Sequence, residues 1–238
     1  MPDGRACCSP AGSALFNASA IKDMTSIQEY AIQTSVSGRY LLQLPSNSVP
    51  APLLIGFHGY GQTAEDEIAL LKAIPGSARW LCCSIEALHP VYTPRGETGA
   101  SWMTSRAREQ RITENVNYVD AVIKRIRESA SVGDRLCFHG FSQGCGMACR
   151  AALLGSYRAC GLMLLGGDIP PELSVNGGVD RVHLARGNED RFYSPEKYEH
   201  DCARFRDAGL PFTATLFRGE HGANDEYYDA AGAFLATV

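Results

Sequence analysis

The stretch LCFHGFSQGCGMACRAALL, residues 136–154, places Ser142 between Gly140 and Gly144, directly after an apolar run and directly before a helix-like run. This pattern predicts a buried strand, a sharp turn at the serine and a helix that begins at Gln143. Such a turn projects the serine hydroxyl out of the chain only where the neighbouring residues leave room for it. The stretch therefore predicts an α/β architecture with a reactive serine at the strand-to-helix turn.

Apolar runs alternate with amphipathic segments along the rest of the chain, which predicts eight strands separated mainly by helices. Near-continuous apolar strands indicate a mainly parallel sheet covered by helices on both faces. The first two strands, joined through Ser37 and Gly38, read as a hairpin that gives the sheet an antiparallel edge. We expect strands at 29–36, 39–44, 53–58, 78–87, 135–141, 161–167, 181–187 and 212–217, and helices at 64–74, 110–130, 143–155, 195–208 and 225–236.

Length and composition indicate one well-buried domain. The chain has 238 residues, 45% of them hydrophobic, and a formal net charge of −4. This charge gives no electrostatic footprint for nucleic acid, and no window approaches 18 apolar residues, so we expect neither nucleic-acid binding nor integral membrane association. We expect an N-terminal extension over residues 1–27, without order of its own, and a single domain over residues 28–238.

The nine cysteines do not read as a disulfide framework, because their number is odd and several lie inside apolar runs. Reduced thiols fit a cytoplasmic protein, and no signal-peptide pattern opens the chain. We therefore expect a cytoplasmic location.

Ligands of open α/β sheets lie at the carboxyl ends of the strands, where this chain places a histidine and several acids. A serine needs a base, and where the serine sits on such a turn the acid and then the histidine follow it in the chain. His183 lies inside an apolar strand and His200 within a helix, whereas His221 follows a strand beside Gly222. His221 is the predicted general base.

Three acidic residues are candidates for the group that orients this histidine. Asp190 follows the predicted strand 181–187 and is favoured, Asp168 follows strand 161–167 and is the alternative, and Glu189 is the third option. The oxyanion donors are expected to be the backbone N–H groups of Gln143 and Tyr60. His58 precedes the serine in the chain, so we expect it to brace the turn around Tyr60.

The motifs HGYGQ (58–62), GFSQG (140–144), GNED (187–190) and EHG (220–222), in this order, resemble the alpha/beta-hydrolase superfamily, and most closely its phospholipase/carboxylesterase branch, which includes acyl-protein thioesterases. The resemblance implies a serine esterase that needs no metal or cofactor, is often cytosolic and is sometimes dimeric. By position it supports Ser142 as nucleophile, Asp190 as acid, His221 as base, and Tyr60 and Gln143 as oxyanion donors.

Substrate contacts are expected from the irregular loop 89–105, which is too long for a simple connector. We expect it to present Tyr92 and Trp102 to an acyl or aryl group, although Trp102 alternatively packs the loop onto the body. Arginines in and after this loop could attract an acidic leaving group. The short segment between strands 161–167 and 181–187 leaves no room for a large cap, so we expect an open site.

The favoured hypothesis is a serine hydrolase that cleaves a small-molecule carboxylic ester or thioester through an acyl-enzyme, with a homodimer as a possible assembly. One alternative is a peptidase-like or acyl-transfer hydrolase of the same fold. The other is a non-catalytic binding module, against which the complete set of Ser142, Asp190 and His221 counts.

Overall fold

The computed structural model describes residues 27–46 and 50–238. The chain divides into two units, Met1–Ser35 and Val36–Val238, and each is described by itself. The described part of the first unit, residues 27–35, is exposed chain without a helix or strand. The second unit contains all the described helices and strands.

The hairpin predicted near the start of the chain is absent. Residues 29–36 form no strand, and only the second half of the predicted hairpin is found, as β1 (Tyr40–Gln43). The side chains of Tyr30 and Ile32 are exposed, so the alternating apolar residues of this stretch have no buried face that would stabilise a strand. The predicted extension, residues 1–27, lies outside the described residues except for Ile27.

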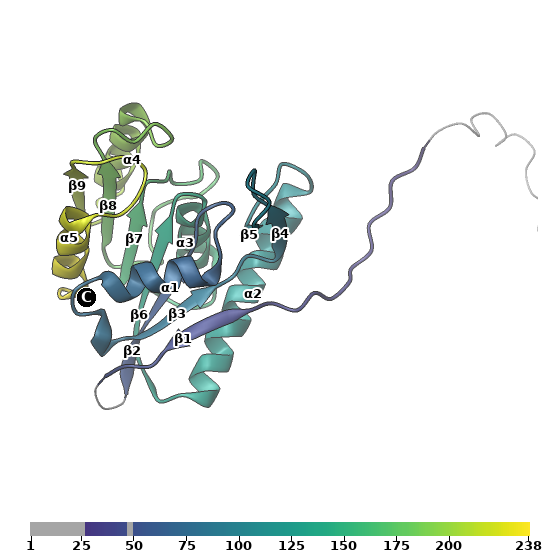
Figure 1. Ribbon diagram of the computed structural model, residues 1–238, viewed down its shortest axis with the longest axis horizontal. Helices are drawn as coiled ribbons and strands as arrows, with labels where there is room; N and C mark the ends of the chain where they lie inside the picture. Colours follow the sequence, from purple (N-terminus) through teal and green to yellow (C-terminus); the bar gives the residue numbers. More distant parts are fainter. Residues whose placement is uncertain (1–26, 47–49) are drawn as a thin grey trace, which may run out of the picture. The chain divides into compact units, whose positions relative to one another are not determined.

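Seven strands of the described chain form one sheet: β1, β2 (Ala51–Phe57), β3 (Leu81–Ile85), β6 (Val132–Phe141), β7 (Gly161–Leu165), β8 (Val182–Gly187) and β9 (Phe212–Phe217). Their order across the sheet is β1-β3-β2-β6-β7-β8-β9 (Figure 1). β1 runs antiparallel to β3, and every other neighbouring pair is parallel. The predicted mainly parallel sheet with an antiparallel edge is therefore confirmed, with seven strands instead of eight.

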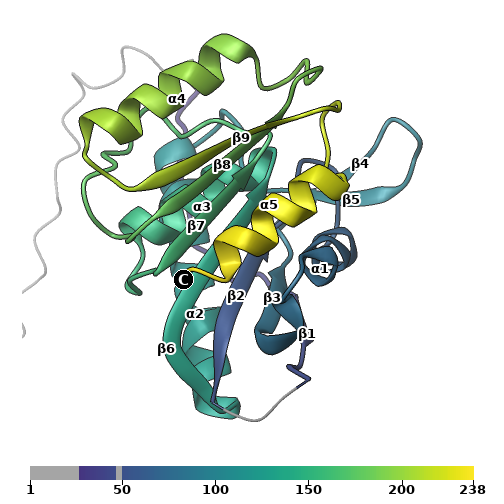
Figure 2. The same cartoon turned by 90° about the vertical axis from the view of Figure 1, so that its left-hand side faces the viewer.

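Helices cover both faces of this sheet, as the buried apolar strands require. One core packs α2 (Arg108–Ser129), α3 (Gln143–Leu154) and α4 (Pro195–Asp207) against the sheet. A second core packs α1 (Ala64–Ala73) and α5 (Asp225–Leu235) on the other face. Figure 2 shows α5 in front of the strands, with α2 and α3 behind them.

Side-chain caps fix where the helices next to the candidate site begin. Ser194 caps α4, which has Pro195 in its first turn, and Asn224 caps α5 by accepting from the N–H of Tyr227.

The strand predicted over 78–87 begins only at Leu81, because Ser77–Arg79 forms a 3-10 turn.

The loop predicted as irregular contains a small hairpin, β4 (His89–Tyr92) and β5 (Thr98–Ser101), which is separate from the main sheet. Between β7 and β8 the chain forms no helix, in agreement with the predicted absence of a large cap. Among the described residues, no helix combines the length and the apolar character needed to cross a membrane.

Candidate active site

Ser142 lies at the junction of β6 and α3 in a conformation that side chains rarely adopt, with φ of 53° and ψ of −117°. Backbone strain of this kind costs about 1–3 kcal/mol and persists only where the surroundings enforce it. Here the two flanking glycines allow the close approach. A Cβ on Gly140 would lie 2.4 Å from the carbonyl oxygen of Gly144, and one on Gly144 would lie 1.8 Å from that of Phe57. The turn therefore requires both glycines.

The structure brings Ser142, His221 and Asp190 together in one chain of hydrogen bonds. His221 Nε2 lies 2.9 Å from Ser142 Oγ, and His221 Nδ1 lies 2.8 Å from Asp190 Oδ2. A carboxylate only accepts, so the single proton of a neutral imidazole belongs on Nδ1 and leaves Nε2 free to accept from the serine hydroxyl. This is the tautomer that a general base needs.

The Asp190 carboxylate is buried and held by its own turn. Its Oδ1 accepts from the backbone N–H groups of Phe192, at 2.8 Å, and Tyr193, at 3.0 Å. Arg186, which is also buried, donates to the carbonyl oxygens of Asp190 and Tyr193 from β8. The turn that carries the acid is therefore fixed from both sides.

The two alternative acids have other surroundings, and neither is hydrogen-bonded to His221 in the described part of the chain. Asp168 is more than half exposed, and its Oδ2 lies 3.4 Å from Lys197 Nζ. The side chain of Glu189 is exposed as well. Of the three acids, Asp190 is therefore the one whose carboxylate contacts His221.

The two predicted oxyanion donors have backbone N–H groups without a hydrogen-bond acceptor in the described part of the chain. The N–H of Gln143 is at the first position of α3, where no intrahelical acceptor exists. The N–H of Tyr60 lies in a turn whose other amides are used, since Gly59 donates to Gln62 Oε1 and Gly61 to the carbonyl of Ala100. Both N–H groups are thus left for a ligand.

His58 braces this turn, as predicted. Its Nε2 accepts from the N–H of Ala87 at 3.1 Å, so Nδ1 carries the proton and donates to the carbonyl of Gly59 at 2.7 Å. Burial lowers the pKa of His58, which keeps the ring neutral and this pair of bonds intact.

The expectation that Trp102 presents its ring to a substrate is wrong, and the alternative, that it packs the loop onto the body, is correct. The side chain is 0% exposed, packs edge-on against Phe57, and donates from Nε1 to the carbonyl of His58 at 3.0 Å. Its large apolar surface and single polar atom are both satisfied in the core. Tyr92, by contrast, is 80% exposed on β4, and its contact with substrate stays a prediction.

The side chain of Gln143 ties the loop around Trp102 to the nucleophile turn. Its Oε1 accepts from the N–H of Trp102 at 2.9 Å, and its Nε2 donates to Ser101 Oγ and to the carbonyl of Met103. The sequence identified only the backbone role of Gln143. The clamp could not be recognised, because its partners lie about 40 residues away in the chain.

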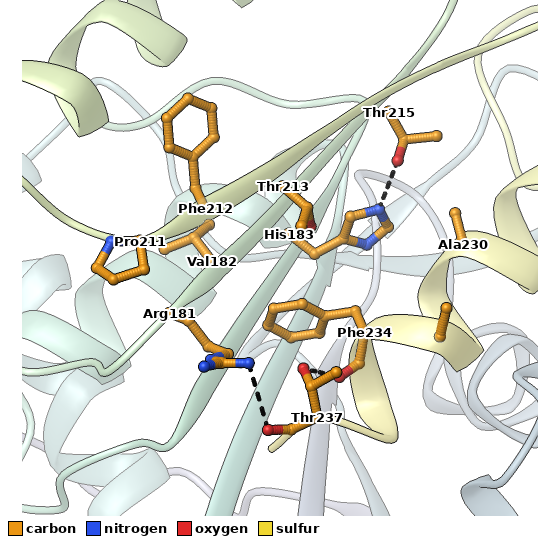
Figure 3. Close-up of a pocket in the computed structure, with 11 residues that line it drawn as sticks. Arg181, Val182, His183, Pro211, Phe212, Thr213, Thr215, Ala230, Phe234 and Thr237 are labelled. Carbon is orange, nitrogen blue, oxygen red and sulfur yellow. Dashed lines mark hydrogen bonds between the residues drawn. The ribbon is translucent and has the colours of Figure 1, made fainter.

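Ser142 opens into a small cavity of about 210 Å³ that runs along one face of α3. A larger cavity, of about 540 Å³, lies between β8, β9 and α5 (Figure 3), and none of Ser142, Asp190 and His221 lines it. The smaller cavity is therefore the candidate active-site cavity, and it is lined by Met103, Arg108, Ser142, Gln143, Gly146, Arg150, Asp168, Pro170 and Pro171.

Behind the site lies a buried polar chain that the sequence analysis missed. His139 Nδ1 lies 2.6 Å from Glu67 Oε1, and His139 Nε2 lies 2.7 Å from the hydroxyl of Tyr227. A histidine inside an apolar strand and a glutamate on the inner face of α1 were the available signals. This chain links α1, β6 and α5 beneath the turn of Ser142.

Comparison with known proteins identifies the family of the chain. An alpha/beta-hydrolase family model described as phospholipase/carboxylesterase matches residues 44–191, more than half of the chain. No curated protein sequence matches this chain.

Solved structures share the fold at low sequence identity. Esterase PE8 is 20% identical, with a TM-score of 0.69 over 85% of this chain and 100% of that chain. The Bacillus cereus carboxylesterase is 15% identical, with a TM-score of 0.68 over 84% and 94%. Arabidopsis thaliana SOBER1 is 17% identical, with a TM-score of 0.64 over 79% and 98%. The predicted fold class is confirmed.

Proposed function

Since the chain belongs to the phospholipase/carboxylesterase family of alpha/beta-hydrolases, we propose that it cleaves carboxylic esters through an acyl-enzyme formed on Ser142. The observation that carries the proposal is the unbroken hydrogen-bond chain from Ser142 through His221 to Asp190. A thioester offers the same electrophilic carbonyl and is a second substrate for the same steps.

In the first half-reaction, Ser142 Oγ attacks the ester carbonyl and its proton passes to His221 Nε2. The resulting imidazolium is stabilised by the buried carboxylate of Asp190, whose Oδ1 accepts two backbone N–H groups. The tetrahedral intermediate then breaks its bond to the alcohol oxygen, which takes the proton from Nε2. The alcohol leaves and the acyl group stays on Ser142.

In the second half-reaction, water takes the place of the alcohol. His221 Nε2 accepts a proton from the water as its oxygen attacks the acyl carbon, and the same nitrogen returns the proton to Ser142 Oγ. The free acid leaves and the serine hydroxyl is restored.

Negative charge develops on the carbonyl oxygen in both steps. The backbone N–H groups of Tyr60 and Gln143 would donate to this oxygen, and the N-terminus of α3 points its positive dipole end toward it. Removing one such donor typically costs about 10²–10³-fold in kcat.

The experiment that tests the proposal is hydrolysis of p-nitrophenyl esters, from acetate to palmitate, by the wild type and by Ser142→Ala. Turnover should fall by several orders of magnitude in the variant. Thermal unfolding shows whether both proteins are folded, and a fluorophosphonate should label the wild type but not Ser142→Ala. A folded wild type that neither turns over any ester nor accepts the label would overturn the proposal in favour of a binding module.

A cytoplasmic location is part of the same proposal. The seven cysteines of the described chain are free thiols, and six of them are buried. Burial raises the pKa of these buried thiols, for example that of Cys82 to about 12, which keeps them unreactive as small core side chains.

A further inference from the structure

The wall of the Ser142 cavity carries a buried arginine. Gln143, Gly146 and Arg150 lie on one face of α3, spaced by three and four residues, and all three line the cavity. Arg150 is only 4% exposed. A buried guanidinium needs partners, so the contacts of its three nitrogens decide what it does.

Two of these nitrogens are used by Glu172. Arg150 Nε and Nη2 donate to Glu172 Oε1 at 3.1 and 2.6 Å. Arg108 Nη2 donates to the same carboxylate, at 3.2 and 3.1 Å from its two oxygens. Burial opposes ionisation of Glu172, but its bonds to Arg150 and Arg108 outweigh this and lower its pKa, so the carboxylate stays charged and fixes both arginines.

The third nitrogen, Arg150 Nη1, has no hydrogen-bond acceptor in the described part of the chain. It lies beside Gly146, where an added Cβ would stand 3.3 Å from it. Gly146 is four residues after Ser142, which is roughly 6 Å along a helix axis. The guanidinium thus reaches back along α3 toward the nucleophile, and the missing side chain of Gly146 gives it room.

The charges around the cavity do not cancel. Arg108, Arg150 and Asp168 line the cavity. Glu172 pairs with both arginines and Lys197 lies 3.4 Å from Asp168, so the five groups together carry one net positive charge. The cavity is also small, at about 210 Å³. A small, positively charged cavity favours an anionic ligand over a long alkyl chain.

We propose that the cavity selects short esters that carry a carboxylate near the scissile bond, with Arg150 Nη1 and Arg108 as the groups that bind it. The inference rests on the proposed function, since the carboxylate is bound beside the same Ser142. It names the substrate class that the family membership leaves open.

The test compares matched pairs of esters that differ only in the charge of one group. Monoethyl glutarate and ethyl glutaramate place a carboxylate or its neutral amide in the acyl part, whereas 4-acetoxybutanoate and 4-acetoxybutanamide place it in the alcohol part. Hydrolysis is followed in a pH-stat at low salt. In at least one pair we expect kcat/KM to be tenfold or more higher for the carboxylate, and the pair that shows it assigns the cavity to the acyl or the alcohol side.

Variants then assign the preference to the arginines. Arg108→Gln and Arg150→Met should each reduce the carboxylate-to-amide ratio severalfold toward one. Because Arg150→Met leaves Glu172 without its main partner, the double variant Arg150→Met/Glu172→Gln is the version to use if the single variant does not fold. Arg158→Gln, which removes an exposed arginine paired with Asp180, is the matched control and should keep the wild-type ratio.

The outcomes separate the two proposals. Equal kcat/KM for acid and amide in both pairs, with labelling of Ser142 intact, would overturn the carboxylate preference and leave the esterase standing. Where none of the four esters is turned over, protection of Ser142 from a fluorophosphonate by glutarate, but not by glutaramide, supports the preference, and equal protection contradicts it. Absence of labelling would overturn both.

Discussion

Asp190 Oδ2 lies 2.8 Å from His221 Nδ1, while Oδ1 of the same carboxylate accepts two backbone N–H groups from its own turn. The carboxylate therefore has one oxygen for its own loop and one for the histidine. Rotation of the side chain would break all three bonds, so the orientation of the imidazole is determined by the conformation of residues 190–193.

Replacing this acid tests its assignment directly. Asp190→Asn keeps the shape of the side chain but presents an N–H toward Nδ1, which favours the tautomer that cannot accept the serine proton. We expect kcat to fall by about 10⁴-fold with the fold retained. Asp168→Asn tests the alternative acid: Asp168 pairs with Lys197, so with a neutral ester such as p-nitrophenyl acetate its kcat should stay within a fewfold of the wild type. A large loss in Asp168→Asn with little in Asp190→Asn would reverse the assignment.

The glycines of the turn provide a prediction about stability. Gly144→Ala would place a Cβ 1.8 Å from the carbonyl oxygen of Phe57, a backbone atom that cannot move without displacing β2. We expect the free energy of unfolding to fall by about 3 kcal/mol or more. Gly133→Ala is matched to it, because its Cβ would meet nothing closer than 3.9 Å. Urea denaturation should show the first variant destabilised and the second within about 0.5 kcal/mol of the wild type.

The features that the sequence predicted correctly are those set by local pattern. Apolar runs and helical periodicity placed the sheet and its helices within a few residues, and the order of Ser142, Asp190 and His221 along the chain identified three residues that lie together. The parallel sheet explains why: the ends of β6, β8 and β9 meet at one edge, so residues that follow these strands become neighbours.

The features that the sequence did not predict depend on which surfaces and side chains come into contact in the folded chain. Alternation at residues 29–36 indicates a strand only where one face is buried, and here both faces are exposed. The sequence is equally compatible with Trp102 in the core and with Trp102 in the substrate site. In the structure its Nε1 donates to the carbonyl of His58, which places the ring in the core. Arg150 is a charged side chain whose burial depends on Glu172, 22 residues further along the chain, so no local pattern signalled it.

The corrected position of Trp102 leads to a prediction that separates stability from specificity. Trp102→Phe keeps an aromatic ring against Phe57 but leaves the buried carbonyl of His58 without its donor. We expect a loss of about 1–3 kcal/mol in the free energy of unfolding and no change in the preferred chain length among p-nitrophenyl esters. Tyr92→Ala, at the exposed position on β4, should leave stability within about 0.5 kcal/mol. A shifted chain-length preference in Trp102→Phe would return that ring to the substrate site.

His183 leads to a prediction about how the stability of the protein depends on pH. The ring is buried between Tyr227 and Phe234, and its Nε2 lies 3.0 Å from Thr215 Oγ1 (Figure 3). Burial lowers its pKa from 6.5 to about 4, so the folded protein keeps it neutral over a range in which the unfolded chain takes up a proton. The unfolded state then binds more protons, and stability must rise with pH across this window. The contribution of His183 is complete above pH 6.5 and is lost as the pH falls toward 4.

Comparing unfolding curves across this window isolates the contribution of His183. The free energy of unfolding of the wild type, measured with urea between pH 7 and pH 4.5, should fall more steeply than that of His183→Gln, with a difference approaching about 3 kcal/mol at the acid end. His200→Gln removes an exposed histidine from α4 and should keep the wild-type slope. Carboxylates contribute to the slope in all three proteins, so only the difference between them reports on His183. Parallel curves for the wild type and His183→Gln would mean that the ring takes up its proton in the folded state near its ordinary pKa, which its burial between two aromatic rings argues against.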